Sequence, residues 1–202
     1  MKITRDQIFT IVFMLVISAI FALVLAGANA FYQPKIQENA LVAERSAILY
    51  VFGLDTEGTS AEILSRFDSN VKPHSASGLD MFAQVDAQGK VLGLAVPFAG
   101  AGLWGRIEGY LGVSPDLKAI KGIVFTAQNE TPGLGGRIDE LAYREQFRNI
   151  AIQPGTKLAY GADGGNQLDA ITGATSTSKA VLQMLNDLLE NTISKMEVAS
   201  NG

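Results

Sequence analysis

The sequence contains no cysteine, and this absence excludes disulfides, thiolate nucleophiles and iron–sulfur ligation. A zinc site built on its single histidine, His74, would have to take its other ligands from carboxylates, and we see no Ser/His/Asp set that could operate with this histidine. We therefore expect no metal centre and no general base or nucleophile, and we assign His74 no role. Basic residues are also scarce, because 16 Lys and Arg stand against 20 Asp and Glu, for a formal net charge of −4. A nucleic-acid partner is not expected, since phosphate binding needs clustered Lys and Arg.

What the sequence does have is a long uncharged run near its N-terminus. Residues 8–28 read IFTIVFMLVISAIFALVLAGA, and about 20 apolar residues suffice for a helix to cross the hydrocarbon core of a bilayer. We expect Pro34 to end this helix. Residues 1–33 are thus predicted to be an anchor in the lipid of the cytoplasmic (inner) membrane. Lys2 and Arg5 give a slight bias towards a cytoplasmic N-terminus, which would place the rest of the chain on the extracytoplasmic side.

A cleaved signal peptide is the alternative interpretation of the same segment. Ala28-Asn29-Ala30 fits a small-x-small cleavage site. The apolar run is longer than the usual signal-peptide core of about 7–15 residues, however. The length therefore favours a retained anchor.

Residues 34–202 are expected to form one α+β domain with an antiparallel sheet and helices packed on it. Helical patterns occur at 37–50, 61–67 and 140–147, and strand patterns at 81–86, 91–96, 105–113, 119–126 and 157–160. Segments 70–78 and 163–166 are expected to be a polar loop and a turn, with Ser60 as a helix cap.

The last helix is the clearest element. Its apolar residues repeat at helical spacing: Val181, Leu182, Leu185, Leu188, Leu189 and Ile193. Ser176, Thr177 and Ser178 are candidate caps for its N-terminus.

The segment Asp169-Ala-Ile-Thr-Gly-Ala-Thr175 directly precedes this helix. A phosphate at a helix N-terminus meets free backbone N–H groups and the positive end of the helix dipole. Gly173 and Ala174 leave room for close approach, and Thr175 offers a hydroxyl for a phosphoester. The alternative is an ordinary capped helix start, for which Ser, Thr and Asp are the favoured residues.

Two glycine-rich segments could contact a flat ligand. Residues 130–136 read ETPGLGG, in which Pro132-Gly133 sets a turn and the following glycines allow close backbone approach. The spacing is not that of a dinucleotide fingerprint, and a tight surface loop is the alternative. Residues 100–105 read GAGLWG and hold the only tryptophan, Trp104, which could cover a ring system or pack at the edge of the core.

Together and in this order, GLW, ETPGLG and DAITGAT resemble the FMN-binding subunits of two related membrane complexes. These are NqrC of the Na⁺-translocating NADH:quinone reductase (Nqr) and RnfG of the Rnf ferredoxin:NAD⁺ oxidoreductase. The resemblance implies that a flavin transferase joins FMN, taken from FAD, through its phosphate to Thr175. It implies cofactor-binding roles for these residues: Asp169, Thr172, Gly173, Ala174, Trp104, Glu130, Thr131, Gly133, Leu134 and Gly135. Relatives often carry a histidine shortly before ETPGLG, where this chain has Gln128-Asn129.

The resemblance also implies a function. The chain would be an electron carrier with covalent FMN, acting as an oxidoreductase only with sibling membrane subunits of an ion-translocating complex. GLW leans towards Nqr, whereas the ending TGATSTSKAV and the short length lean towards Rnf. Two alternatives stay open: an anchored extracytoplasmic binding or assembly domain without covalent flavin, and a stand-alone flavin domain of an extracellular reductase.

Overall fold

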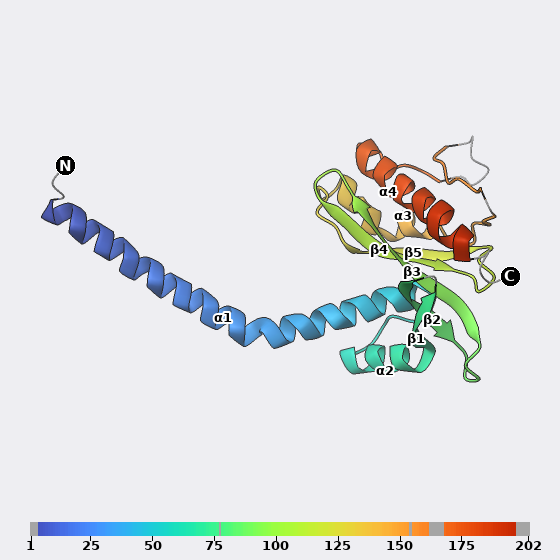
Figure 1. The fold of residues 1–202 in the computed structure, drawn as a ribbon, viewed down its shortest axis with the longest axis horizontal. Coiled ribbons are helices and arrows are strands. Elements are labelled where there is room, and N and C mark those ends of the chain that lie inside the picture. Colours follow the sequence, from blue (N-terminus) through green and yellow to red (C-terminus); the bar gives the residue numbers. More distant parts are fainter. Residues whose placement is uncertain (1–3, 77, 154, 162–167, 197–202) are drawn as a thin grey trace. The chain divides into compact units, whose positions relative to one another are not determined.

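The computed structural model describes residues 4–76, 78–153, 155–161 and 168–196 (Figure 1). The chain divides into two compact units, residues 1–41 and 42–202. The sequence analysis predicts a boundary between residues 33 and 34. That position is eight residues before the boundary in the structure and lies inside the first helix.

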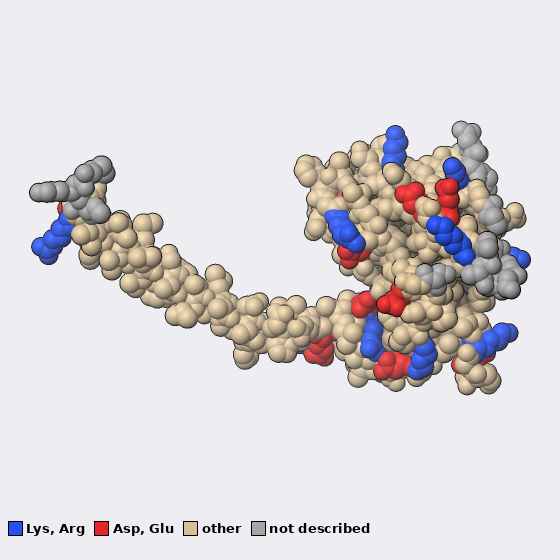
Figure 2. All heavy atoms as spheres, in the orientation of Figure 1, with Lys and Arg blue, Asp and Glu red and all other residues tan. Residues whose placement is uncertain are grey.

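Helix α1 (Arg5–Val51) contains the whole uncharged run. The expectation that Pro34 ends the helix is wrong, because Pro34 lies inside it and the predicted 37–50 helix is its continuation. A proline removes one backbone hydrogen bond, and here the helix-favouring residues on both sides outweigh that loss. None of the residues in the most apolar 18-residue window is buried, and by length and composition the helix could cross a membrane. Figure 2 shows this uncharged surface as a long stretch without blue or red atoms.

The second unit contains a five-stranded antiparallel sheet in the order β1-β2-β3-β4-β5. The strands are β1 (Val71–Ala76), β2 (Leu79–Val85), β3 (Val91–Ala101), β4 (Arg106–Val113) and β5 (Ile120–Ala127). The predicted α+β class with an antiparallel sheet is confirmed.

Two predicted segments differ from the structure. The segment 70–78, expected to be a loop, contains edge strand β1, whose polar residues face solvent and whose Pro73 is tolerated at an edge. The strand expected at 157–160 does not form: only Tyr160 makes an isolated bridge, with Leu168. The turn expected at 163–166 lies outside the described residues.

Helices cover both faces of the sheet (Figure 1). On one face, α4 (Thr175–Leu188) packs with the short α3 (Leu141–Glu145), the 3₁₀ turn η1 (Gly135–Asp139) and the π-helical turn η3 (Leu189–Ile193). On the other face lie the end of α1 and α2 (Ser60–Asn70). Strand residues alternate between the two cores, as β4 shows: Leu111 faces the first and Tyr110 the second.

The end of α1 is fixed closely to the sheet. Gly112 and Gly122 are paired across β4 and β5, and a Cβ on Gly112 would lie 2.3 Å from a methyl carbon of Val51. These glycines therefore allow the helix end to approach the strands. The Arg148 guanidinium donates to the carbonyl oxygens of Tyr50 at 2.8 Å and of Lys121 at 2.6 Å, which joins the last turn of α1 to β5.

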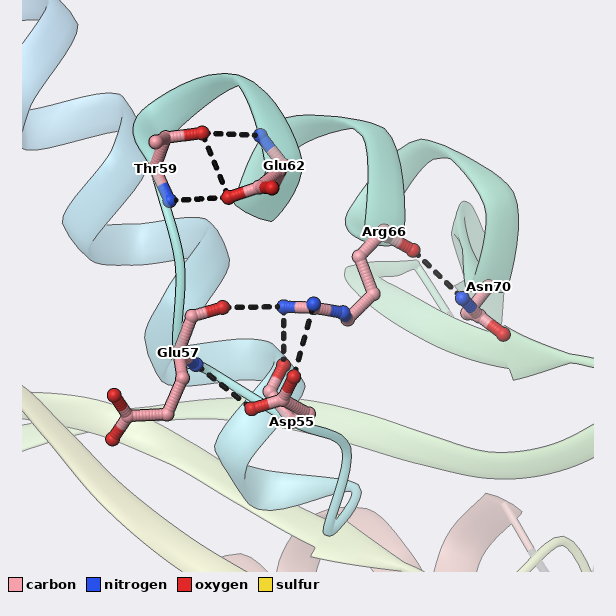
Figure 3. Close-up of polar contacts among 6 residues, drawn as sticks. All are labelled: Asp55, Glu57, Thr59, Glu62, Arg66 and Asn70. Atoms are coloured by element: carbon pink, nitrogen blue, oxygen red, sulfur yellow. Dashed lines mark hydrogen bonds and ion pairs between the residues drawn. The ribbon is translucent and has the colours of Figure 1, made fainter.

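Helix α2 begins with a complete capping box (Figure 3). The Thr59 N–H donates to Glu62 Oε2 at 2.7 Å, and the Glu62 N–H donates to Thr59 Oγ1 at 3.4 Å. The cap is thus Thr59 and not the expected Ser60, which is the first helical residue.

Candidate functional site

The GLW segment is the turn between β3 and β4. The Gly102 N–H donates to the Gly105 carbonyl oxygen at 2.7 Å and closes the turn. Leu103 and Trp104 project from it with 57% and 69% of their surfaces exposed. Trp104 is therefore not packed at the edge of the core, and two large apolar side chains are presented to solvent.

The ETPGLGG segment connects β5 to η1. Gly133 has φ +75°, a left-handed conformation that glycine adopts without strain. The Thr131 carbonyl oxygen accepts hydrogen bonds from the N–H groups of Leu134 and Gly136, which makes the loop compact. Leu134 is 45% exposed at its tip, whereas Glu130 at its base is buried.

The DAITGAT segment leads directly into α4. Gly173 has φ +81°, and the helix begins at Thr175 after the N-cap residue Ala174. The expectation that Ser176, Thr177 or Ser178 caps the helix is wrong, because α4 has no side-chain cap hydrogen bond. Asp169, Thr172 and Thr175 are all exposed.

Thr177 and Ser178 do not cap because they are buried and bonded to other segments. The Ser178 hydroxyl accepts from the Ile171 N–H at 3.0 Å. The Thr177 hydroxyl donates to Glu130 Oε2. Within the same turn Thr175 and Ser176 stay on the outside of the helix.

Glu130, in the ETPGLGG segment, links the GLW turn to the first turn of α4, two residues after DAITGAT. Its Oε1 accepts from the backbone N–H groups of Leu103 at 2.9 Å and Trp104 at 3.0 Å, while its Oε2 accepts from Thr177. The segments are therefore held together although they are up to 74 residues apart in sequence, from Leu103 to Thr177. The second and third motifs also touch directly, because Leu134 packs against Gly173. A Cβ on Gly173 would lie 3.2 Å from a methyl carbon of Leu134.

Sequence reasoning missed Gln128 and the inward role of Thr177. Gln128 accepts from the Glu130 N–H at 2.6 Å and donates to Asp139 at 2.9 Å, so it fixes the base of the loop. The helical spacing of Thr177 from Val181 and Leu185 is a signal that could have placed Thr177 on the buried face.

Two tyrosines support the start of α4 from the core side. The Tyr160 hydroxyl donates to the Ser178 carbonyl oxygen at 3.0 Å and lies 2.7 Å from the Tyr143 hydroxyl. Burial raises the pKa of both phenols, so both keep their protons at neutral pH and can donate. On the same side, the Asp169 N–H donates to the Gln146 side chain at 2.6 Å, which fixes the backbone of Asp169 and leaves its carboxylate exposed.

Residues 102–190 match the family described as the FMN-binding domain. The similarity runs from the turn between β3 and β4 to the start of η3. All three motifs lie in the matched region or at its first residues, which agrees with their meeting at one place in the structure.

The named proteins to which this chain is similar include NqrC proteins of Na⁺-translocating NADH-quinone reductases. The protein from Pasteurella multocida is 37% identical over 100 residues, which cover 46% of this chain and only 38% of that protein. The protein from Pseudomonas aeruginosa is 26% identical over an alignment that covers 87% of this chain and 88% of that protein.

Two solved structures share the fold. The crystal structure of Shewanella oneidensis NqrC has a TM-score of 0.64 at 20% identity, covering 77% of this chain and 98% of that one. The crystal structure of the corresponding Na⁺-translocating NADH-quinone reductase protein from Parabacteroides distasonis has the same TM-score at 23% identity, covering 77% of this chain and 92% of that one. At 20% and 23% identity, these comparisons show the shared fold alone.

The residues at the start of α4 suit FMN. A helix N-terminus without a side-chain cap offers backbone N–H groups to a phosphate, and the exposed Thr175 hydroxyl stands at that position. Leu103, Trp104 and Leu134 offer exposed apolar surface of the kind that an isoalloxazine ring can contact.

Proposed function

We propose that this chain is an electron-transfer subunit that carries FMN covalently on Thr175 within a membrane-bound, ion-translocating NADH:quinone reductase complex. The observation that supports this most directly is the meeting of the three motifs beside an exposed threonine at an uncapped helix start. The names of the similar proteins favour the Nqr type over the Rnf type.

Attachment requires a simple group transfer at Thr175. The Thr175 oxygen would form a bond to the FMN phosphorus of FAD, the bond between the two phosphates of FAD would break, and AMP would leave. The hydroxyl proton would pass to solvent, and a separate flavin transferase would supply the catalysis. The resulting phosphodiester has one negative charge, which the first N–H groups of α4 can satisfy.

Each part of the chain then has a role. Bound FMN supplies the redox chemistry, because its ring accepts and releases electrons. The start of α4 holds the phosphate, and Asp169, Thr172, Gly173 and Ala174 shape that turn. Trp104 and the 131–135 loop, with Thr131, Gly133, Leu134 and Gly135, lie beside the ring, while α1 attaches the domain to the membrane next to sibling subunits. A covalent link keeps the flavin at its site whatever the free concentration outside the cytoplasm.

The experiment is co-expression of the full-length chain with a flavin transferase, followed by a denaturing gel viewed under ultraviolet light. We expect a fluorescent band that requires the transferase. A dark band with the intact mass of the bare sequence would support an anchored binding or assembly domain instead. Recovery of a fluorescent chain without sibling subunits from its native membrane would support a stand-alone flavin domain.

Membrane orientation can be tested separately, because the sequence has no cysteine. We expect a Gln88→Cys variant, at an exposed turn of the domain, to react with a membrane-impermeant maleimide added outside intact spheroplasts. Labelling only after lysis would place the domain in the cytoplasm.

A further inference from the structure

Glu130 is a buried carboxylate whose neighbours come from three separate segments. It is 5% exposed, and its hydrogen bonds described above come from two backbone N–H groups and one hydroxyl. Burying a carboxylate is costly unless donors replace the lost water. These three donors therefore fix Glu130, and Glu130 in turn fixes the three segments.

The space around the carboxylate is closed by two glycines. A Cβ on Gly102 would lie 2.5 Å from Glu130 Oε1, and a Cβ on Gly135 would lie 2.5 Å from Thr177 Oγ1 and 2.8 Å from Glu130 Oε2. Neither oxygen has room for an additional large group. This packing favours a role for Glu130 within the protein over direct contact with a ring.

We propose that Glu130 and Thr177 form a positioning pair that sets the Trp104 turn and the Thr175 turn relative to each other. The inference rests on the proposed function, because these two turns are the ones assigned to the ring and to the phosphate. Thr177 is two residues from Thr175 in the first turn of α4, so its inward bond holds Thr175 outward. The other carboxylate oxygen holds the Leu103 and Trp104 N–H groups, so the two turns are linked through one side chain.

This link predicts an effect at a distance. Removing the Thr177 hydroxyl leaves one carboxylate oxygen without its donor, and the carboxylate then shifts or draws in water. Trp104 should respond although it makes no described bond with Thr177. Because Trp104 is the only tryptophan, fluorescence excited at wavelengths where the five tyrosines do not absorb reports on its turn.

The test compares Thr177→Val with Thr177→Ser in the full-length chain. The readouts are the steady-state fluorescence anisotropy of Trp104 before flavin attachment, and the rate at which added transferase and FAD label the protein. We expect Thr177→Val to lower the anisotropy and to slow labelling about tenfold, as for a lost hydrogen bond to a charged group. Thr177→Ser keeps the hydroxyl and should restore both values.

Thr192→Val is the matched control, because Thr192 lies further along the same helical run and outside the motifs. It should leave both readouts at their wild-type values. If Thr177→Val does not fold by circular dichroism, Glu130→Gln replaces it. That variant keeps an oxygen acceptor for the Trp104 turn but presents an NH₂ group where Oε2 stood, so we expect the same changes with a smaller size.

The outcomes separate the two hypotheses. The positioning hypothesis is overturned if folded Thr177→Val, or its replacement Glu130→Gln, is labelled at the wild-type rate. It is also overturned if the anisotropy of Trp104 is unchanged in that variant. Absence of labelling in the wild-type chain overturns the proposed function instead, and the anisotropy comparison still shows whether the pair links the two turns.

Discussion

The N-termini of α2 and α4 begin with similar residue types and are built differently. At α2, Thr59 and Glu62 satisfy each other's backbone N–H groups in a capping box (Figure 3). At α4, four consecutive hydroxyl residues, Thr175 to Ser178, provide no side-chain cap.

The difference shows what the hydroxyls of α4 do instead. Thr177 and Ser178 face inward and bond to Glu130 and to the Ile171 N–H, whereas Thr175 and Ser176 are exposed. The α2 terminus uses its polar residues for its own stability. The α4 terminus leaves its first N–H groups without a side-chain cap and presents a hydroxyl beside them, which is the arrangement a covalently held phosphate needs.

The largest expected effect is that of Thr175→Ala. We expect it to abolish covalent flavin completely, because the other exposed hydroxyls of this segment, Thr172 and Ser176, do not stand at the acceptor position of the motif. The free energy of unfolding should fall by less than about 1 kcal/mol, since Thr175 does not cap the helix. In-gel flavin fluorescence and urea unfolding measure the two quantities. Labelling that survives this substitution would refute the assignment of the acceptor.

Asp169→Ala should have the next largest effect. Its carboxylate is exposed and its only described bond is through the backbone N–H, so unfolding should change by no more than about 0.5 kcal/mol. The resemblance to the flavin-attachment motif nevertheless predicts a markedly slower attachment. A time course of labelling with added transferase measures this, and a wild-type rate would reduce Asp169 to an ordinary surface residue.

Thr59→Ala is the reciprocal change at the capped terminus. Loss of the capping box should cost about 1 kcal/mol in the free energy of unfolding. The same protein should take up flavin normally, because α2 lies on the opposite face of the sheet from α4. Reduced labelling with unchanged stability would contradict the division of roles between the two termini.

The smallest expected effect is the pH dependence of the same cap. Hydrogen bonds from the Thr59 N–H, and then from its hydroxyl, lower the pKa of Glu62 below the ordinary 4.5. A lowered folded-state pKa means that the added stability is complete above pH 4.5 and is lost as the pH falls through the folded value. The difference in unfolding free energy between wild type and Glu62→Gln should therefore shrink on acidification. A difference that grows at low pH would contradict the cap.

Much of this organisation could be predicted from local patterns. The uncharged run, the strand patterns at 81–86 and 91–96 and the final amphipathic helix can each be recognised within one segment of the sequence. The order of the three motifs can also be read directly from the sequence. Failures came where tertiary contacts decide the local structure. The polar segment of β1 is a strand because β2 pairs with it. Pro34 is a different case, because the helix continues through it on the helix-favouring residues at both sides.

The candidate site shows the same limit. Residue types at Asp169 to Thr175 indicated a phosphate position, and the structure places Thr175 on the surface as that hypothesis needs. No local pattern indicates that Glu130 is buried, since a glutamate in a glycine-rich loop is usually solvated. Its burial depends on donors from the Trp104 turn and from α4 that only the folded chain brings together.

The most direct test of the account is peptide mapping of the mature protein. Cleavage after Lys157 and Lys179 gives one peptide, residues 158–179, that contains every hydroxyl of the α4 start. Fragmentation by mass spectrometry, after expression with a flavin transferase, locates any added group. We predict one FMN on Thr175 and none on Thr172, Ser176, Thr177 or Ser178. An unmodified peptide, or a flavin on another of these residues, would contradict the claim that the uncapped helix start is the cofactor's attachment site.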